Sequence, residues 1–324
     1  MKILLTHTPH MRANYYGNRA VVGLQALGEV TLYQGDATLE GAALIAAAQG
    51  MDIIVADRAT AVPAAIFDGL SGLRAVHRCA VDIRNIDVDS ASRHGVLVTR
   101  AKPGFVESVT ELVFGFLVDL NRGVSRAAAA YHAGTFPKAR IGRQLSGTTI
   151  GLIGYGAIGR AVAPLARAMG MEVLISDPYA TVDPAYRHVS FEDLLAQSDH
   201  VVCLAVATEE TENLINAAAL ARMKPDAVFI NVSRGNLVDE DALATVLREG
   251  RIAGAALDVG RAPDQMPTPS IAGLPNVIAT PHIGGLTPPA IEAQALHTIE
   301  QVRALVGGAV PEGAVNAATW SRRP

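Results

Sequence analysis

A glycine-rich turn between a predicted strand and a predicted helix limits the fold of this chain more than any other feature. The hexapeptide Gly154-Tyr155-Gly156-Ala157-Ile158-Gly159 directly follows the apolar run 149–153, and a helical stretch then ends at Gly170. A strand, a tight turn and a helix in this order are typical of a dinucleotide-binding α/β unit. The glycines let the backbone approach a pyrophosphate, whose charge lies at the helix N-terminus. We therefore predict cofactor contacts at Gly154, Gly156, Ala157, Ile158 and Gly159.

An acidic residue at the end of the next apolar run indicates which dinucleotide is bound. Asp177 follows the run 172–176. A carboxylate in this position accepts hydrogen bonds from the adenosine ribose hydroxyls and repels a 2′-phosphate. The alternative is an ordinary glycine-rich turn with an unrelated aspartate, but the strand, the spacing and the acid agree. We predict NAD, not NADP, as the cofactor.

Short apolar runs alternate with helical stretches along most of the chain. In the second half they lie at 149–153, 172–176, 200–204, 227–232, 254–258 and 277–280, and in the first hundred residues at 2–5, 29–32, 52–55, 74–77 and 96–98. This alternation predicts an α/β protein with two doubly wound parallel sheets. The total of 324 residues is enough for two domains with full cores.

Two longer helices differ from the others. The apolar side chains of residues 105–122 keep a helical period, and we expect this helix to bridge the two α/β units. A second helix is predicted from Thr287, whose hydroxyl is a suitable cap ahead of Pro288, to about Leu305. Residues 311–320 have no periodicity and are expected to pack back on the first unit.

The composition excludes several classes of protein. No apolar run reaches the roughly eighteen residues of a membrane span, and the N-terminal run ends too early for a signal peptide. The net charge of −4 and the absence of a basic tract argue against nucleic acid and anionic membranes as partners. Cys79 and Cys203 lie in apolar runs, which predicts buried free thiols and neither a disulfide nor a metal site. We expect a cytoplasmic protein with a small-molecule substrate.

Further segments accompany the glycine-rich turn, which extends over residues 151–160. They are Asn85-Ile86-Asp87, Met223-Lys224-Pro225, Ile230-Asn231-Val232-Ser233-Arg234-Gly235, Leu237-Val238-Asp239-Glu240, Ala256-Leu257-Asp258-Val259 and Thr280-Pro281-His282-Ile283-Gly284-Gly285. With these segments the sequence resembles the D-isomer-specific 2-hydroxyacid dehydrogenase family over essentially its whole length. The resemblance implies a Rossmann nucleotide domain at 102–286, inserted into a split flavodoxin-like substrate domain at 1–101 and 287–324. It also implies catalysis in the cleft and a homodimer formed through the long helix.

The implied activity is hydride transfer between NAD(H) and a small 2-hydroxy or 2-keto acid. Such a reaction needs one acid/base group for the hydroxyl proton, and His282 is the candidate because imidazole titrates near neutral pH. Arg234 would hold the substrate carboxylate with its planar guanidinium. Ser233 and Asp258 resemble cofactor-side residues, and the family counterpart of Asp258 accepts a hydrogen bond from the nicotinamide carboxamide. A strand-terminal aspartate that caps the next turn is the alternative for Asp258.

The sequence departs from the family pattern beside the predicted acid/base group. The family pairs its histidine with a glutamate, but Pro263 occupies that position here, and the interval before His282 is one residue longer. Asp264 is the nearest acid, and we expect its carboxylate to hold the imidazole and favour the protonated form. Gln265 is the fallback.

A second departure concerns the predicted substrate-binding loop. The family offers backbone N–H groups from a Gly-Val-Gly-like loop, whereas this chain has Ala80-Val81-Asp82-Ile83-Arg84. Val81, Asp82 and Arg84 are therefore the substrate-side candidates, with Asp82 either repelling a carboxylate, paired with Arg84, or turned away. Phe105 stands where the family often has Asn. Residues 7–17 are expected to form a polar loop, in which Arg12 or Tyr15 would reach the substrate.

Two other functions remain open from the sequence. An NAD-binding sensor or corepressor-like protein with vestigial catalysis would explain the missing glutamate, but it would not need both His282 and Arg234. Hydride abstraction from formate or phosphite is disfavoured by the absence of lysine from residues 80–84 and of asparagine at 105.

Overall fold

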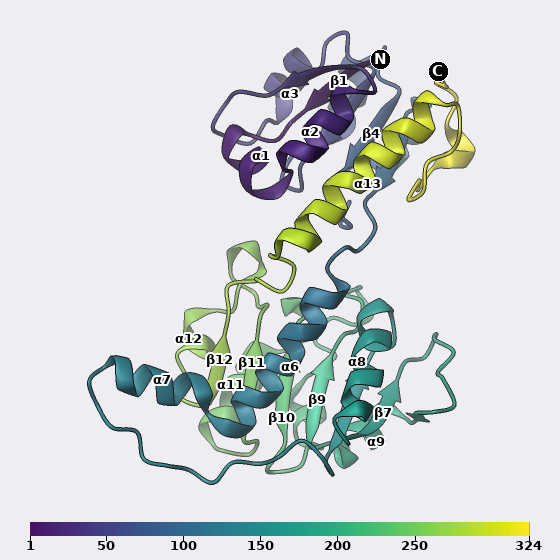
Figure 1. The fold of residues 1–324 in the computed structure, drawn as a ribbon. Coiled ribbons are helices and arrows are strands. Elements are labelled where there is room, and N and C mark those ends of the chain that lie inside the picture. Colours follow the sequence, from purple (N-terminus) through teal and green to yellow (C-terminus); the bar gives the residue numbers. More distant parts are fainter. Residues whose placement is uncertain (324) are drawn as a thin grey trace. The chain divides into compact units, whose positions relative to one another are not determined.

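The computed structural model describes residues 1–323, and Pro324, the last residue of the expected C-terminal return, lies outside them (Figure 1). The described chain divides into two compact units, which we call unit 1 and unit 2. Unit 1 comprises residues 1–105 and 287–323, and unit 2 comprises Val106–Leu286. No helix within residues 1–323 is both long and apolar enough to cross a membrane.

Unit 2 is built on a seven-stranded parallel sheet with the order β12-β11-β10-β9-β6-β7-β8. The strands are β6 (Thr149–Ile153), β7 (Glu172–Ser176), β8 (Arg187–His188), β9 (His200–Cys203), β10 (Val228–Asn231), β11 (Gly254–Leu257) and β12 (Val277–Ala279). The strand order reverses at β6, and open α/β sheets bind ligands beyond the carboxyl ends of the strands at such a point. The two-residue strand β8 was not predicted, because its Arg-His sequence carries no apolar pattern.

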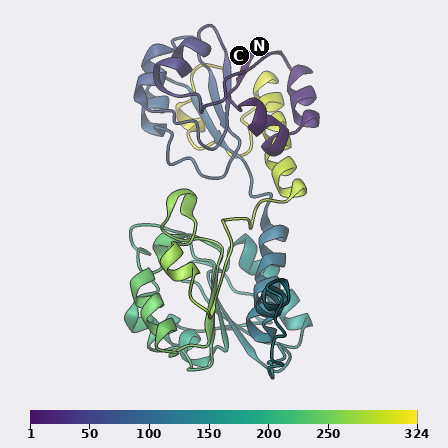
Figure 2. The same ribbon diagram turned by 90° about the vertical axis from the view of Figure 1, so that its left-hand side faces the viewer.

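Helices cover both faces of the unit 2 sheet. They are α6 (Val106–Arg122), α7 (Val124–His132), α8 (Ala157–Ala168), α9 (Phe191–Gln197), α10 (Ala217–Leu220), α11 (Glu240–Arg248) and α12 (Pro269–Ala272). Figure 2 shows the teal helices α6 and α8 on one side of the sheet and the green helices α11 and α12 on the other. The helix predicted at 105–122 is α6, but it packs on α8, β10 and β11 and belongs to unit 2, so it is not a bridge.

Unit 1 has a five-stranded parallel sheet with the order β2-β1-β3-β4-β5. Its strands are β1 (Lys2–Leu5), β2 (Glu29–Leu32), β3 (Ile53–Ala56), β4 (Ala75–Arg78) and β5 (Leu97–Arg100). Its helices are α1 (Pro9–Tyr15), α2 (Asn18–Gln25), α3 (Gly41–Ala47), α4 (Ala64–Gly69), α5 (Val88–Arg93) and α13 (Pro288–Val306). The predicted fold class, two doubly wound parallel sheets, is therefore confirmed.

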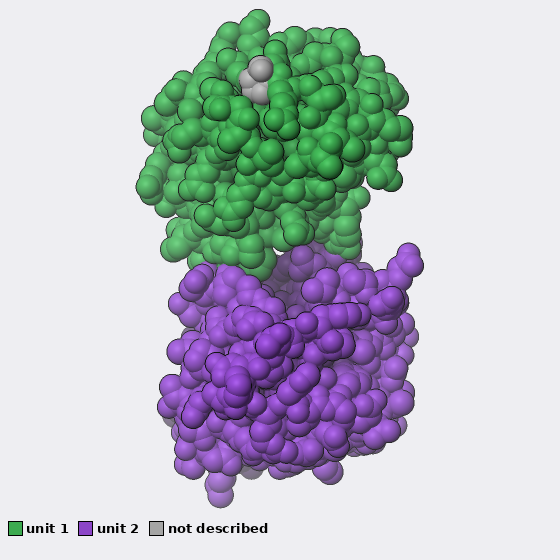
Figure 3. Space-filling view, turned by 90° about the vertical axis from the view of Figure 1, so that its right-hand side faces the viewer, with its two compact units in different colours: residues 1–105, 287–324 green, residues 106–286 purple. Residues whose placement is uncertain are grey.

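Unit 1 is formed from two segments that are far apart in the sequence, both green in Figure 3. Helix α13 packs against α2 and β4, and its Ile299 and Leu305 share an apolar core with Ile3 and Leu24. Thr287 caps α13 by accepting a hydrogen bond from the Ala290 N–H, as predicted. Trp320 is buried in the same core, so the aperiodic C-terminal residues pack back on this unit.

Candidate functional site

The glycine-rich turn follows β6 and leads into α8. Gly154 has φ of 101°, and a Cβ atom there would lie 2.8 Å from the carbonyl carbon of Leu204. A Cβ on Gly159 would lie 2.6 Å from the Gly154 carbonyl oxygen. Both positions therefore require glycine, one for its backbone angle and both for close packing.

The open side of this turn has the features of an anion site. A Cβ on Gly156 would meet no atom within 4 Å, and no side chain caps α8 at this residue. The first N–H groups of the twelve-residue helix, from Ala157 to Gly159, have no carbonyl partner within the helix. N–H groups at the positive end of a helix favour a phosphate. The residues present thus fit the pyrophosphate of a dinucleotide.

Asp177 joins the end of β7 to the glycine-rich turn. Its carboxylate accepts hydrogen bonds from the main-chain N–H groups of Tyr155 at 2.7 Å and of Tyr179 and Ala180 at 2.9 Å. Partial burial alone would raise the pKa of Asp177, but these backbone hydrogen bonds outweigh it, and the pKa lies below its ordinary value. The carboxylate is therefore ionised at neutral pH and placed beside the turn.

The turn after β10 is held by a residue that was not predicted. Buried Asn231 accepts a hydrogen bond from the Ser233 N–H at 3.1 Å and donates one to the Arg234 carbonyl at 3.0 Å. The Ser233 hydroxyl donates to the Ala205 carbonyl at 2.6 Å. Arg234, half-buried, donates from Nη1 to the Ser233 carbonyl at 2.7 Å. Asn side chains often bond the backbone two residues further on, so Asn231 was itself a turn signal in the sequence.

Asp258, at the end of β11, holds the turn that contains His282. The residue is 1% exposed, and its carboxylate accepts hydrogen bonds from the Thr280 hydroxyl at 2.6 Å and from the Ile283 and Gly284 N–H groups at 2.8 Å. The Asp258 carbonyl also accepts the His282 N–H at 2.9 Å. These are the contacts of the turn-capping alternative, while the cofactor role of Asp258 stays a prediction.

His282 has a backbone partner for one ring nitrogen. Nδ1 lies 2.9 Å from the main-chain carbonyl oxygen of Asp264, and a carbonyl can only accept, so Nδ1 carries the proton of this bond. Asp264 and His282 both have positive φ, 55° and 56°. The predicted residue therefore reaches His282, but the contact seen in the structure uses the carbonyl where a carboxylate was expected. Nε2 is left as the ring nitrogen that can exchange a proton with a substrate.

The predicted substrate-side loop lies in unit 1, after β4. Arg84 donates to the Asp82 carboxylate from Nε at 3.0 Å and from Nη2 at 2.5 Å. This hydrogen bond raises the pKa of Arg84. Of the alternatives for Asp82, the structure has the pairing with Arg84, which neutralises its charge. Val81, half-buried, begins this loop.

Residues 7–17 are not the predicted loop. Thr8 caps α1 by accepting a hydrogen bond from the Met11 N–H, and Pro9 occupies the first helical turn. Arg12 donates to the main-chain carbonyls of His7 and Tyr33, so its guanidinium is engaged in holding this helix. The polar composition led us to predict a loop, and the short helix was missed. The Thr8-Pro9 pair is nevertheless a typical helix start and could have indicated it.

The whole chain is similar to proteins of one enzyme family. The family model described as "D-isomer specific 2-hydroxyacid dehydrogenase, NAD binding domain" matches residues 114–284. The (S)-sulfolactate dehydrogenase of Chromohalobacter salexigens is 34% identical over 303 residues, which cover 91% of this chain and 97% of that protein. The D-3-phosphoglycerate dehydrogenase of Mycobacterium leprae is 36% identical over 84% of this chain, but the match spans only 52% of that longer protein.

A solved structure gives the same result for the fold. The TT0316 protein from Thermus thermophilus superimposes with a TM-score of 0.87 and 31% sequence identity. The superposition covers 97% of this chain and 100% of that chain.

Proposed function

Because the chain belongs to the D-isomer-specific 2-hydroxyacid dehydrogenase family, it is an NAD-dependent oxidoreductase, and we propose that His282 and Arg234 make it interconvert a small 2-keto acid and its 2-hydroxy acid. The observation that supports the role of His282 most directly is the hydrogen bond from its Nδ1 to the Asp264 carbonyl. It fixes one ring nitrogen and leaves the other for proton transfer. Bound NAD supplies or accepts the hydride.

His282 moves the hydroxyl proton. With Nδ1 protonated, neutral imidazole has its lone pair on Nε2, which takes the proton when the hydroxy acid is oxidised. In the reverse direction Nε2–H of the imidazolium donates that proton to the keto oxygen. Asp258 holds the turn that carries His282, since its carboxylate binds the Thr280 hydroxyl before His282 and the Ile283 and Gly284 N–H groups after it.

Arg234 binds and polarises the substrate. Its guanidinium would pair with the substrate carboxylate and draw electron density from the reacting carbonyl. Asn231 supports this role by fixing the backbone on both sides of Ser233. We also propose that the backbone around Val81 donates to the substrate carboxylate, which the neutralised Asp82–Arg84 pair permits. Ser233 and Asp258 remain proposed cofactor-side residues, Ser233 beside the Ala205 carbonyl.

The activity is tested by following NADH oxidation with a panel of 2-keto acids that differ in side chain, including glyoxylate, hydroxypyruvate and 3-sulfopyruvate. We expect turnover with at least one of them and the reverse reaction with the matching hydroxy acid. NADH binding without turnover of any member of the panel would contradict the proposal and favour a nucleotide sensor.

A homodimer is the assembly that the surface of unit 2 supports. Large apolar side chains are exposed along α6, α7 and the following segment: Val118, Val124, Tyr131, Phe136 and Ile141. An apolar hollow lies on the same surface, lined by Phe114, Gly115, Val118, Asp119, Val124 and Ser125. An apolar surface of this kind usually marks a protein interface. Light scattering after size-exclusion chromatography should give twice the mass of the chain, and Phe136→Asp should shift it towards the monomer.

We propose a cytoplasmic location because the two cysteines are free thiols. Cys79 and Cys203 are buried and free, as expected in a reducing compartment. Fractionation of the cells that produce the protein tests this location, and recovery in a membrane or extracellular fraction would contradict it.

A further inference from the structure

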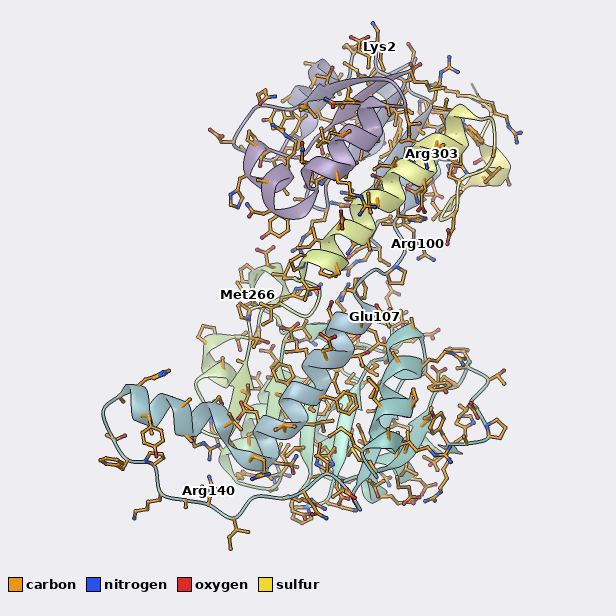
Figure 4. The ribbon with its side chains drawn as sticks, in the orientation of Figure 1. Lys2, Arg100, Glu107, Arg140, Met266 and Arg303 are labelled. Atoms are coloured by element: carbon orange, nitrogen blue, oxygen red, sulfur yellow. The ribbon has the colours of Figure 1, made fainter. Side chains whose placement is uncertain are left out.

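The loop between β11 and the His282 turn closes on itself. The Gly260 N–H donates to the Gln265 carbonyl at 2.7 Å, and the Ala262 N–H donates to the Met266 carbonyl at 3.0 Å. Asp264 and Gln265 both adopt left-handed backbone angles, with φ of 55° and 57°. We call residues 260–268 the brace loop; Met266, labelled in Figure 4, lies on it. Its backbone turns the Asp264 carbonyl towards His282.

Arg261 ties the brace loop to two neighbouring segments of unit 2. Its Nη2 donates to the Glu212 carboxylate at 2.8 Å, to the Asn213 side-chain oxygen at 2.5 Å and to the Val238 carbonyl at 3.0 Å. Its Nε donates to the same Val238 carbonyl at 3.1 Å. One guanidinium thus connects the loop with the chain after β9 and the chain after β10.

Glu240, in the first turn of α11, holds both ends of the brace loop. One carboxylate oxygen accepts the Arg261 N–H at 2.8 Å, and the other accepts the Thr268 hydroxyl at 2.7 Å. The loop between these two anchors cannot shift without breaking one of them. The position of the loop is therefore set by Glu240 and not by Asp264, the residue whose carbonyl contacts His282.

We propose that the Asp264 main-chain carbonyl fixes the His282 tautomer, and that Arg261 and Glu240 are positioning residues that aim this carbonyl. The proposal deepens the proposed function and rests on it for the role of His282 in catalysis. A neutral acceptor selects the Nδ1–H form as a carboxylate would, because both accept a hydrogen bond from the same ring nitrogen. It differs from a carboxylate in placing no negative charge against the ring.

The test uses full-length protein and compares Arg261→Ala, Arg261→Lys and Arg251→Ala. Arg251 is the matched control, because it precedes β11 and pairs with Glu249 at 2.7 Å on the surface. The ring nitrogens of His282 are read by NMR on histidine-labelled protein, with His282→Gln identifying the signal. The kinetic constants for the keto acid and the dissociation constant of NADH are measured on the same samples.

We expect the neutral Nδ1–H form in the wild type and in Arg251→Ala, and a gain of the Nε2–H form in Arg261→Ala. Arg261→Ala should also lower kcat about tenfold while leaving NADH affinity within about twofold, since misplacement of a reacting group affects the chemical step. Arg261→Lys should recover part of both effects. Wild-type tautomer and kcat in Arg261→Ala would overturn the proposal.

Two further variants separate a failure of this proposal from a folding defect and from a failure of the proposed function. If Arg261→Ala does not fold, Thr268→Val loosens the loop at its other anchor, and the same tautomer shift with a loss of about threefold in kcat is expected; an unchanged tautomer would overturn the proposal. Full activity of His282→Ala would defeat the proposed function alone, because the tautomer measurement does not depend on turnover.

Discussion

The carboxylate of Asp177 accepts the main-chain N–H of Tyr155 at 2.7 Å, so the acid after β7 is bonded directly to the middle of the glycine-rich turn. The negative charge that would meet the adenosine ribose and the N–H groups that would meet the pyrophosphate are therefore parts of one rigid unit. Cofactor selection should depend on this pairing.

Asp177→Ala should weaken NADH binding about tenfold and reduce the preference for NADH over NADPH, because the ribose loses an acceptor and the 2′-phosphate loses a repelling charge. Fluorescence titration with both nucleotides measures the change. Asp183→Ala, at an exposed aspartate of the same segment, is the control. An unchanged nucleotide preference would remove Asp177 from the cofactor site.

His282→Ala and Arg234→Ala should each lower kcat/KM for the keto acid by on the order of a hundredfold or more. NADH affinity should stay within about twofold in both, because these side chains act on the substrate and its proton. Steady-state kinetics and NADH titration provide the comparison. Wild-type turnover in His282→Ala would rule out its role as the acid/base group.

Asp264→Asn tests which atom of Asp264 matters for catalysis. Keto-acid reduction takes its proton from the imidazolium of His282, so its rate falls when a high pH removes that proton. A carboxylate partner would stabilise the imidazolium, and its removal would move this falling limb to lower pH. With a carbonyl partner, which asparagine retains, we expect the limb to stay in place. A pH–rate profile from pH 5 to 10 distinguishes the two.

Buried histidines make the stability of the protein sensitive to acid. Burial lowers the pKa of His77 to about 3 and those of His7 and His200 to about 4. The unfolded chain takes up these protons below about pH 6.5 while the folded chain does not, so the free energy of unfolding falls as the pH drops from there towards 4. Each histidine adds a slope of at most about 1.4 kcal/mol per pH unit.

Urea unfolding at several pH values between 7.5 and 4.5 measures this slope. His77→Gln should make it shallower, because one proton fewer is taken up on unfolding. His10→Gln, at an exposed histidine, should leave the slope unchanged. Equal slopes in His77→Gln and the wild type would show that His77 does not contribute to the pH dependence of stability.

The sequence predicted features whose signals are local. The strand, glycine-rich turn and helix at 149–170 are specified by consecutive residues, and the same is true of the Thr287-Pro288 helix start. The fold class followed because the alternation of strands and helices leaves few alternatives.

Features that depend on the direction of the backbone could not be predicted from the sequence. The hydrogen bond from His282 Nδ1 to the Asp264 carbonyl was not predicted, because residue type is visible in a sequence and the direction of a carbonyl is not. The long reach of Arg261 to Glu212 and Val238 joins segments that become neighbours only in the folded sheet. The two-residue β8 and the short α1 are too brief to show a period.

The brace loop has a consequence for mutational scanning. All amino acids carry the same carbonyl oxygen, so replacing Asp264 with another side chain leaves the acceptor of His282 in the chain. A scan for loss of activity should therefore point to Arg261 and to Gly260, where a Cβ would lie 2.4 Å from the Cα of Pro267, and it should pass over most substitutions at 264. Proline is the clearest exception, because its ring holds φ near −65° and cannot adopt the left-handed angle at this residue, and β-branched residues disfavour that angle. Mutations therefore reveal the atom that orients the imidazole only at neighbouring residues, or at 264 where the new residue disfavours the left-handed backbone angle.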